Sequence, residues 1–408
     1  MTSDQTVAVI GAGQAGGWTA KTLRDEGFKG QVILIGDEDY PPHERPPLSK
    51  EVLLGKAEKE ACFLWPPEIL NDAKINMRPG VTVTSINPTQ HTLSIDGDED
   101  VKWDKLMIAT GGQARTLPVE GKDLDGVFTL RTIADAEAIR TRLLNNTKVL
   151  IVGAGWIGLE VAAAARNLGA ETVVIEVADR VCARAVTPEM SQWILELHLK
   201  NGVDVRLGVV FDHFAGSEYL ERAVLADGSE IMCDIAVVGI GLRPNTELAE
   251  LAGLAVDNGI VVNEIGQTSH PDIYAAGDVA NHPNSHLGRR IRLESWENAQ
   301  NQAICAAKAM LGATEPYAEI PWFWSDQFDA NIQLMGLPED WDERVLRGDR
   351  EAGEFIEFYL KAGKLEGAAA VNNARDLRFT RRMIESGRTF EQSSLSNPDI
   401  KLQKLLRG

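Results

Sequence analysis

The sequence predicts an α/β protein with two parallel-sheet domains and a smaller α+β domain at its C-terminal end. Residues 7–38 and 149–179 repeat one pattern, in which a β-branched run, a glycine-rich turn, an alanine-rich amphipathic stretch and a second apolar run follow each other. This pattern is typical of a βαβ unit in a buried parallel sheet. From about residue 318 the chain is aromatic-rich, with two hairpin-like stretches and a basic amphipathic helix from Asp376. A chain of 408 residues is also too long for one core.

The composition is ordinary for a globular protein, with 44% hydrophobic and 25% charged residues. A net charge of -19 disfavours nucleic acid or an anionic membrane as a partner. No run approaches the roughly 18 apolar residues of a membrane span, and we see no secretory signal. The four cysteines contain no CxxC pair, which favours a reducing, cytoplasmic compartment and argues against a metal site.

The first glycine-rich turn has the spacing G-x-G-x-x-G, formed by Gly11, Gly13 and Gly16 directly after an expected strand. The first glycine permits the tight turn, the second lets a pyrophosphate approach the backbone, and the third allows close helix–strand packing. The N-terminus of the following helix then presents free N–H groups to the phosphates. Asp37 lies 21 residues after Gly16, where an acid can accept hydrogen bonds from ribose hydroxyls.

The second turn repeats this spacing with Gly153, Gly155 and Gly158, and Glu176 follows 18 residues after the last of them. A carboxylate at this position binds a free ribose 2′-hydroxyl and repels a 2′-phosphate, which favours NADH over NADPH. Arg180 and Arg184 are close enough in sequence to leave NADPH open. Two complete copies predict two Rossmann-like dinucleotide-binding domains.

Further strands are expected between and after the two repeats. Short alternating strands lie at 81–86 and 92–95, with an acidic turn at 96–100, and a buried strand ends at Thr110 and Gly111. Residues 235–245 contain another strand. Residues 267–280 are expected to form a short strand that runs into a turn and a helix.

Several segments resemble the flavoprotein reductases of glutathione-reductase-like fold, in particular the NADH-dependent ferredoxin reductases of oxygenase systems. The similarity runs nearly end to end. Its most specific segments are RPPLSK (45–50), ATGG (109–112), AAGDVA (275–280), ESWENAQNQA (294–303) and PWFWSDQF (321–328). It implies an FAD-binding domain at 1–114 and 246–318, an NADH-binding domain at 115–245, and a C-terminal α+β interface domain at 319–408.

The resemblance also implies which residues contact FAD. Asp278 would accept from the ribityl chain, with a helix N-cap as the alternative role, and Lys50 would lie beside the flavin N5. An interdomain salt bridge is the alternative for Arg131, and core packing for Trp296. The full set is Gly11, Gly13, Ala15, Gly16, Asp37, Arg45, Lys50, Val83, Ala109, Thr110, Gly111, Arg131, Asp278 and Trp296.

For NADH the resemblance implies a second set of contacts. Glu160 would reach the nicotinamide carboxamide, with a helix-face glutamate as the alternative, and Gly241 would allow close approach of the nicotinamide. Trp324 would lie at the nicotinamide side, unless it is core, and we expect it to act in catalysis with Lys50 and Glu160. The full set is Gly153, Gly155, Ile157, Gly158, Glu160, Glu176, Arg184 and Gly241.

The positions of the cysteines select among enzymes of this fold. Disulfide reductases carry a redox-active cysteine pair in the helix after the first ribose-binding strand, whereas residues 41–56 here contain none. Cys62, Cys182, Cys233 and Cys305 are interpreted as packing residues. Electrons must therefore leave the flavin directly for an external acceptor.

The resemblance implies that this acceptor is an iron–sulfur ferredoxin. We expect a [2Fe–2S] protein of a Rieske-type ring-hydroxylating dioxygenase in aromatic hydrocarbon catabolism, so the chain would be an FAD-dependent NADH:ferredoxin oxidoreductase. Alternatives are a P450-linked ferredoxin, a rubredoxin, a small-molecule flavin oxidase or monodehydroascorbate-type reductase, and a redox-sensing binding protein similar to apoptosis-inducing factor. The chain could be a monomer or a homodimer.

An acidic ferredoxin needs a locally basic docking site despite the negative net charge. Two clusters qualify, and the first is preferred because it directly precedes the ESWEN segment and is therefore expected closer to the cofactor, whereas a solvated helix face is the alternative for the second. They are Arg289, Arg290 and Arg292, and the helical set Arg375, Arg378, Arg381 and Arg382.

Overall fold

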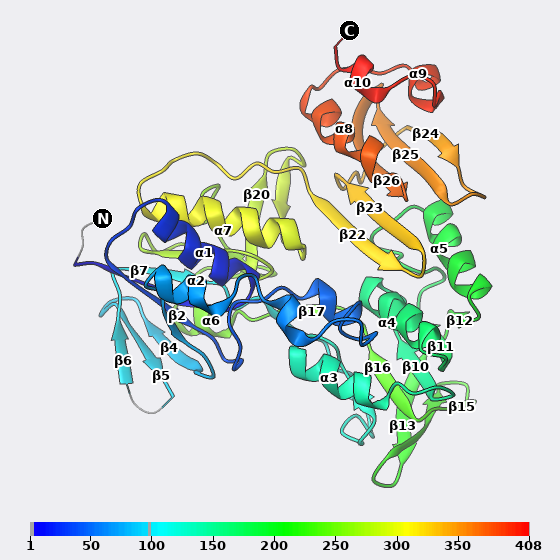
Figure 1. Cartoon of the computed structure of the whole chain (residues 1–408), viewed down its shortest axis with the longest axis horizontal. Coiled ribbons are helices and arrows are strands. Elements are labelled where there is room, and N and C mark those ends of the chain that lie inside the picture. The colour runs from blue at the N-terminus through cyan, green and yellow to red at the C-terminus, as the bar shows by residue number, and fades with distance from the viewer. Residues whose placement is uncertain (1–3, 97–98, 408) are drawn as a thin grey trace. The chain divides into compact units, whose positions relative to one another are not determined.

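The computed structural model describes residues 4–96 and 99–407, so part of the predicted acidic turn at 96–100 lies outside the described residues (Figure 1). These residues form two compact units. The first joins Met1–Pro46, Cys62–Gln113 and Arg243–Glu319, and the second joins Pro47–Ala61, Ala114–Leu242 and Ile320–Gly408. The boundaries of the three predicted domains stay a prediction.

The first unit is built on a five-stranded sheet in the order β19-β7-β1-β2-β3, and its paired strands are parallel. Along β1, Val7 and Val9 point into one core, and Ala8 and Ile10 point into another on the opposite face. The sheet is therefore buried on both faces. Its strands are β1 (Thr6–Ile10), β2 (Gln31–Ile35), β3 (Asn76–Arg78), β7 (Lys105–Ile108) and β19 (Ile273–Ala275).

Two helices, α1 (Gln14–Asp25) and α7 (Trp296–Met310), pack against each other over the same face of this sheet (Figure 1). Their close approach is possible because the buried face of α7 is made largely of alanine. The shorter helices of the unit are α2 (Pro67–Asp72) and α6 (Glu247–Leu251).

Two small sheets complete the first unit. One has the strands β4 (Val83–Asn87), β5 (Thr92–Ile95) and β6 (Glu99–Lys102), and the other has β18 (Ile260–Val261), β20 (Ala280–Asn284) and β21 (Arg289–Ile291). The expected helix after Asp278 is wrong, because β20 follows there instead. Pro283 lacks a backbone N–H and disfavours the helical conformation at the residue before it, which excludes a regular helix at this point.

The second unit repeats the parallel architecture, with a sheet in the order β12-β11-β10-β16-β9. Its strands are β9 (Val127–Phe128), β10 (Lys148–Val152), β11 (Glu171–Glu176), β12 (Asp204–Leu207) and β16 (Ile235–Val238). A small sheet of β13 (Phe211–Gly216), β14 (Leu220–Leu225) and β15 (Glu230–Met232) shares its core. The helices are α3 (Ile133–Arg142), α4 (Trp156–Asn167) and α5 (Pro188–Lys200).

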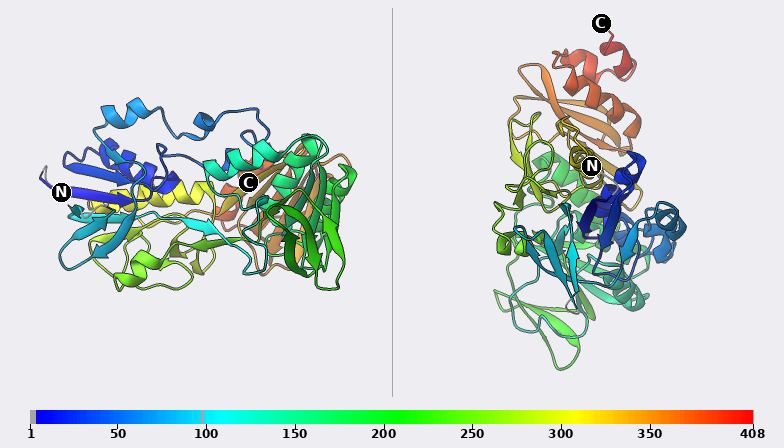
Figure 2. Two further views of the ribbon diagram at one scale, coloured as in Figure 1. Left: turned by 90° about the horizontal axis from the view of Figure 1, so that it is seen from below. Right: turned by 90° about the vertical axis from the view of Figure 1, so that its left-hand side faces the viewer.

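The C-terminal part of this unit is an antiparallel sheet in the order β22-β23-β26-β25-β24, with helices packed against it (Figure 2). The two predicted hairpin-like stretches, 344–346 and 354–360, form two strands that pair with each other, and the amphipathic helix is also present. The strands are β22 (Trp322–Gln327), β23 (Ala330–Met335), β24 (Glu343–Asp349), β25 (Glu354–Lys361) and β26 (Lys364–Val371). The helices are α8 (Ala374–Glu385), α9 (Gln392–Ser396) and α10 (Leu402–Leu405).

The remaining elements are short. They are the 3₁₀ turns η1 (Pro46–Ser49) and η2 (Lys59–Cys62), and the strands β8 (Gly112–Ala114) and β17 (Leu242–Pro244). Within residues 4–96 and 99–407, no helix has the length and apolar character to span a membrane. Across the same residues, no group of three or more His, Cys, Asp or Glu side chains is placed to hold a metal ion.

Candidate active site

The turn after β1 is packed so tightly that two of its positions admit only glycine. A Cβ on Gly11 would lie 2.2 Å from the carbonyl oxygen of Ala109, and φ there is +100°. A Cβ on Gly16 would lie 1.7 Å from the carbonyl oxygen of Gly11. These contacts press the start of α1 against β1, as the fingerprint predicts. Ala15, between them in sequence, is buried, and its Cβ would lie 3.0 Å from a Cβ added at Gly277.

Gly13 is different, because nothing in the protein requires a glycine there. It caps α1 with an ordinary φ of -83°, and an added Cβ would meet nothing within 4 Å. The cap makes no side-chain hydrogen bond, and the first turn of α1 carries no acidic residue. The free N–H groups of this helix start therefore fit an anion such as the pyrophosphate of FAD.

The turn after β10 has the same construction. Added Cβ atoms on Gly153 and Gly158 would lie 2.5 Å and 2.1 Å from the carbonyl oxygens of Gly239 and Gly153, whereas Gly155 has only one neighbour, at 3.9 Å. Gly155 caps α4 without a side-chain hydrogen bond. In the first turn of α4, Ile157 is 44% exposed despite its apolar side chain. This second loop therefore fits the pyrophosphate of a second dinucleotide.

The two predicted ribose-binding acids, Glu176 and Asp37, do not occupy equivalent positions in their sheets. Glu176 ends β11, and its two carboxylate oxygens accept from the backbone N–H groups of Ala154 at 2.8 Å and Ala178 at 2.9 Å. The strand register makes Gly36 its counterpart in the first unit, because Ile35 pairs with Ile10 as Ile175 pairs with Val152. Asp37 comes one residue later and is exposed, and its contact with ribose stays a prediction.

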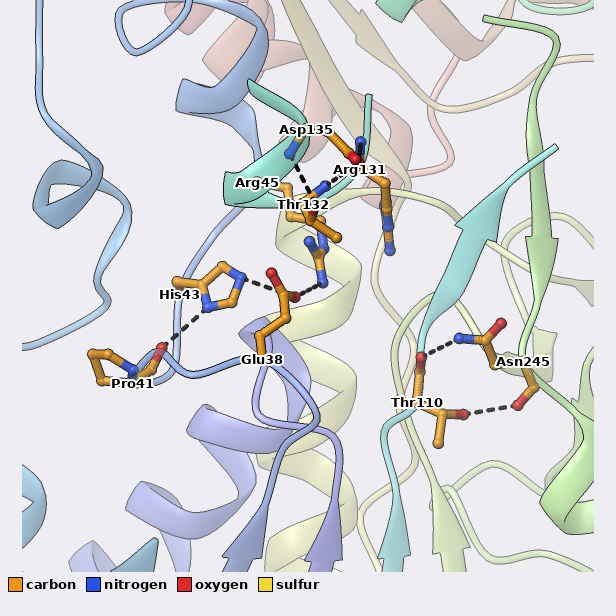
Figure 3. A network of polar contacts seen from close by, with 9 residues as sticks. All are labelled: Glu38, Pro41, His43, Arg45, Thr110, Arg131, Thr132, Asp135 and Asn245. Carbon is orange, nitrogen blue, oxygen red and sulfur yellow. Dashed lines mark hydrogen bonds and ion pairs between the residues drawn. The ribbon is translucent and has the colours of Figure 1, made fainter. Parts of the chain in front are cut away.

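Beside the first loop lies a charged cluster that the sequence did not reveal (Figure 3). Glu38 accepts from Arg45 at 2.9 Å and lies 3.4 Å from Nε2 of His43, and His43 forms a β-bridge with Gly13. Burial raises the pKa of Glu38, but its interactions with His43 and with the Arg45 guanidinium outweigh burial and lower the pKa to about 2. Arg45 is thus held by an ionised carboxylate.

The end of β7 is tied to the segment after β17 by reciprocal hydrogen bonds (Figure 3). The Thr110 hydroxyl donates to the carbonyl of Asn245 at 2.8 Å, and the Asn245 amide donates to the carbonyl of Thr110 at 3.0 Å. The backbone N–H of Asn245 also donates to the carbonyl of Gly111. Thr110 and Gly111 are therefore positioned through their backbone next to Ala109, which contacts the first glycine loop.

The AAGD segment also lies beside this loop. Gly277 has a φ of +83°, and its N–H donates to the buried side chain of Gln302 on α7 at 2.8 Å. Asp278 follows directly, and its backbone carbonyl accepts from Arg292 at 3.1 Å. At the start of α7, the indole N–H of Trp296 donates to Glu44. Their proposed contacts with FAD stay predictions.

Two further predicted FAD residues have structural roles within their own units. Val83 starts β4 and is 7% exposed in the core. Arg131 precedes α3 in the second unit, where the side chain of Asp135 accepts from the backbone N–H groups of Arg131 and Thr132, both at 2.9 Å (Figure 3). This capping box fixes the backbone on which the Arg131 side chain stands.

Glu160 of α4 is the centre of a buried polar cluster in the second unit. Its Oε1 accepts from Lys50 Nζ at 3.0 Å and from Ser325 Oγ at 2.6 Å, and its Oε2 accepts from Ser49 Oγ at 2.5 Å. The Glu160 side chain is only 2% exposed and that of Lys50 is 11% exposed. Lys50 and Glu160, predicted from separate motifs, thus form one ion pair.

The third predicted catalytic residue lies against this pair. Trp324 of β22 has its ring centroid 5.7 Å from Lys50 Nζ, which is cation–π distance. Its ring stacks on that of Trp322 at 5.0 Å, and both are partly exposed. Trp324 is therefore not simply a core residue, since its ring faces an ammonium group.

Between β16 and β17, Gly241 has a φ of +108°, and an added Cβ would lie 3.6 Å from a guanidinium nitrogen of Arg184. Arg184 is exposed. Arg180, by contrast, donates to the carbonyls of Val186 and Ala183, so its guanidinium is held within its own loop. Of the two arginines that could accept the 2′-phosphate of NADPH, Arg184 is therefore exposed, whereas Arg180 is already bound to backbone carbonyls.

Two arginines of the preferred docking cluster bind groups of their own unit, although Arg289 and Arg290 are both exposed. Arg290 donates to the carbonyls of Val262 at 2.6 Å and Asn281 at 2.5 Å, and Arg292 bridges Asp278 and Glu294 with a side chain only 9% exposed. On α8, Arg375, Arg378 and Arg382 are exposed along one helical face. Because Arg290 and Arg292 bind backbone carbonyls of their own unit, we prefer the second cluster, and the choice between the two stays a prediction.

Comparison with known proteins identifies the relatives of this chain. The family model described as pyridine nucleotide-disulphide oxidoreductase matches residues 5–303, and the one described as reductase C-terminal matches residues 322–406. The ferredoxin–NAD(+) reductase component of the anthranilate 1,2-dioxygenase system of Burkholderia cepacia is 38% identical over 410 residues, covering 100% of both chains.

Solved structures give the same result. The ferredoxin reductase for the CYP199A2 system from Rhodopseudomonas palustris has a TM-score of 0.95 and 36% identity, covering 99% of this chain and 100% of its own. The covalent putidaredoxin reductase–putidaredoxin complex gives a TM-score of 0.96 and 34% identity, with 100% and 99% covered. These matches confirm the predicted fold class.

Proposed function

We propose that this chain, which belongs to the pyridine nucleotide-disulphide oxidoreductase family and is one of its ferredoxin reductases, carries electrons from NADH through FAD to the [2Fe–2S] ferredoxin of a ring-hydroxylating dioxygenase. The predicted cofactors, FAD and NAD(H), follow from that membership. When bound, FAD supplies the redox chemistry, accepting two electrons from NADH and releasing them singly.

The residues proposed to hold the cofactors fit them in three respects. The open Gly13 and Gly155 leave room for a phosphate at the start of each long helix, where N–H groups and the helix dipole favour negative charge. Arg45, oriented by Glu38, adds a positive charge beside the first loop. The ammonium of Lys50 and the carboxylate of Glu160 provide a fixed charge pair for the redox centre.

The observation that carries the proposal is that the four cysteines form no disulfide and three of them are buried. All are free, and Cys62, Cys182 and Cys233 are buried. Burial raises the pKa of the Cys182, Cys233 and Cys305 thiols, that of Cys233 to about 12. A thiol kept protonated cannot act as the nucleophile of a disulfide cycle, so electrons leave for an external acceptor.

The α8 arginines supply a basic surface for that acceptor. Arg375, Arg378 and Arg382 are exposed along one face of α8, on a chain whose net charge is -19. Opposite charges steer an encounter and fix its orientation. We propose that an acidic ferredoxin docks here.

The choice of a dioxygenase system rests on the full-length relative of that kind. A ferredoxin of another oxygenase system is the second candidate, favoured by the likeness to the reductase of the CYP199A2 system. A cytoplasmic location is also proposed. Whether the protein is a monomer or a homodimer follows from light scattering on the purified protein.

An anaerobic titration tests the proposal. The purified yellow protein is titrated with NADH, and in parallel with NADPH, while the flavin absorbance is followed. NADH should bleach the flavin rapidly and NADPH slowly, and added [2Fe–2S] ferredoxin should then be reduced in stoichiometric amount. A flavin that stays oxidised with NADH would exclude the reductase function.

A flavin oxidase or small-molecule reductase would behave differently in the same experiment. Its flavin would be bleached by NADH, would pass nothing to a panel of ferredoxins, and would be reoxidised quickly by oxygen or a small oxidant.

A further inference from the structure

The Lys50–Glu160 pair is connected to a buried histidine through a chain of polar side chains. Ser325 of β22 donates to Glu160 and accepts from the amide of Gln327 at 3.0 Å. The amide oxygen of Gln327 lies 2.9 Å from Nε2 of His198 on α5. Ser325, Gln327 and His198 are all 0% exposed, so bulk solvent does not reach these groups.

The hydrogen bonds that link His198, Gln327, Ser325 and Glu160 all run in one direction. An ionised Glu160 only accepts, so Ser325 must donate to it and use its own oxygen to accept from Gln327. The remaining amide oxygen of Gln327 can only accept, so Nε2 of His198 carries the proton. Burial lowers the pKa of His198 to about 4, although its bond with Gln327 opposes this, so the ring is neutral at neutral pH. Each donor therefore points toward the Glu160 carboxylate.

We infer that Ser325, Gln327 and His198 are positioning residues, which hold the Glu160 carboxylate and through it the Lys50 ammonium in the geometry needed for flavin reduction by NADH. This inference rests on the proposed function. None of the three is in the predicted site set. The signal was present in the sequence as the alternation of Phe323, Ser325 and Gln327 on one face of β22, but polar residues there had no visible partner.

These linked side chains are needed because a misplaced Glu160 carboxylate, a buried charge, would be costly. Glu160 reaches its partners from α4, and a carboxylate with one missing donor can swing toward Lys50 or Ser49. Small displacements of aligned groups can lower a reaction rate by about a hundredfold. A rigid strand that carries the donor prevents this movement, since the rotamers of Ser325 and Gln327 are fixed by burial.

The experiment compares Ser325→Ala and Gln327→Met with Ser191→Ala in the holoprotein. Ser191 is the matched control, because its hydroxyl is equally buried and donates a 2.6 Å hydrogen bond to the carbonyl of Val181, outside the chain. Stopped-flow absorbance gives the NADH dissociation constant and the limiting rate of flavin reduction. We expect a limiting rate about tenfold or more lower in both chain variants, with NADH affinity changed less, and a normal rate in the control.

A second readout does not depend on turnover. In histidine-selective ¹⁵N NMR spectra, the native His198 should show a neutral ring protonated at Nε2. Its signal should move in Ser325→Ala and in Glu160→Gln, two and three side chains away, and stay in place in Ser191→Ala. Thermal melting of each variant shows whether it is folded, and Gln327→Met preserves side-chain volume should the serine variant unfold.

The outcomes distinguish a failure of the positioning role from a failure of the proposed reductase function. If NADH reduces the wild-type flavin, and Ser325→Ala and Gln327→Met behave as Ser191→Ala does in rate and spectrum, the positioning role is refuted while the reductase function stands. A wild-type flavin that NADH does not reduce refutes the proposed function and this inference with it.

Discussion

Lys50 Nζ lies 3.0 Å from Oε1 of Glu160, and the two side chains are only 11% and 2% exposed. This pair joins the RPPLSK segment to helix α4 across 110 residues of sequence. Because both charges are withdrawn from water, each needs the other and the hydroxyls around them.

Removing Glu160 alone should destabilise the protein strongly. We expect Glu160→Leu to lower the free energy of unfolding by about 3–5 kcal/mol, because it leaves the Lys50 ammonium buried without its partner. The double variant with Lys50→Met should recover part of that loss. Urea denaturation followed by circular dichroism gives the values.

The exposed pair Arg142–Asp125 is the control for this prediction. Its side chains are 42% and 41% exposed with an N···O distance of 2.7 Å, so Arg142→Met should cost less than about 1 kcal/mol. Equal losses from the buried and the exposed pair would show that burial gives Lys50–Glu160 no special weight.

Two glycines of one turn should respond differently to alanine. Gly13→Ala should leave the fold intact and weaken FAD binding about tenfold or more, because its methyl group occupies the space proposed for the phosphate. Gly16→Ala should disrupt the fold, since its Cβ would lie 1.7 Å from a carbonyl oxygen. FAD content after purification and far-UV circular dichroism distinguish the two.

The corresponding change in the second loop supplies the cofactor control. Gly155→Ala should retain bound FAD and raise the dissociation constant for NADH, measured by flavin bleaching. Loss of FAD from this variant would contradict the assignment of the second loop to NADH.

Acid should destabilise the protein in part through His198. Its pKa is lowered from 6.5 to about 4 in the folded state, so between these values the unfolded chain binds the proton and the folded chain does not. The stability that depends on a neutral His198 is therefore fully present above about pH 6.5 and is lost as the pH falls toward 4. His198→Gln, which keeps a donor for Gln327, should reduce the loss of stability between pH 7 and pH 5 by about 2 kcal/mol.

His213 provides the matched histidine for that measurement. Its side chain is 32% exposed, so water still reaches it in the folded state. The unfolding free energies of His213→Gln are measured at the same two pH values. A similar reduction in both variants would argue against a specific effect of burial at His198.

Charge reversal should separate the two arginine clusters. Arg378→Glu should raise the KM for ferredoxin about tenfold and leave NADH-dependent ferricyanide reduction unchanged, because Arg378 is exposed on α8. Arg290→Glu should lower both activities, because the guanidinium holds the carbonyls of Val262 and Asn281. Steady-state kinetics with both acceptors decides, and an unchanged KM in Arg378→Glu would remove α8 as the docking surface.

Much of the fold was predictable because its signals are local. The β-branched runs, the glycine spacings and the alanine-rich helices follow from backbone sterics and from periodicity within about 30 residues, so both βαβ units and the C-terminal hairpin were predicted. The helix expected after Asp278 was wrong, since Pro283 disfavours a helix there and β20 pairs with β18 and β21 instead.

The polar clusters were not predictable in the same way. Glu38 and His43 meet only because the segment after β2 folds back on the glycine loop, and Ser325 meets Glu160 across 165 residues. The choice between the arginine clusters likewise depended on which guanidinium groups found backbone carbonyls to bind.

The sequence by itself determined the two dinucleotide-binding units, the family, the cofactors and the absence of a reactive cysteine pair. Only the tertiary structure decided that Lys50, Glu160 and Ser325 form one buried cluster, that Gly13 and Gly155 are open where their neighbours are closed, and that the α8 arginines are exposed. The reason is physical: backbone conformation is fixed by neighbours along the chain, whereas burial and hydrogen-bond partners are fixed by segments that meet only when the chain has folded.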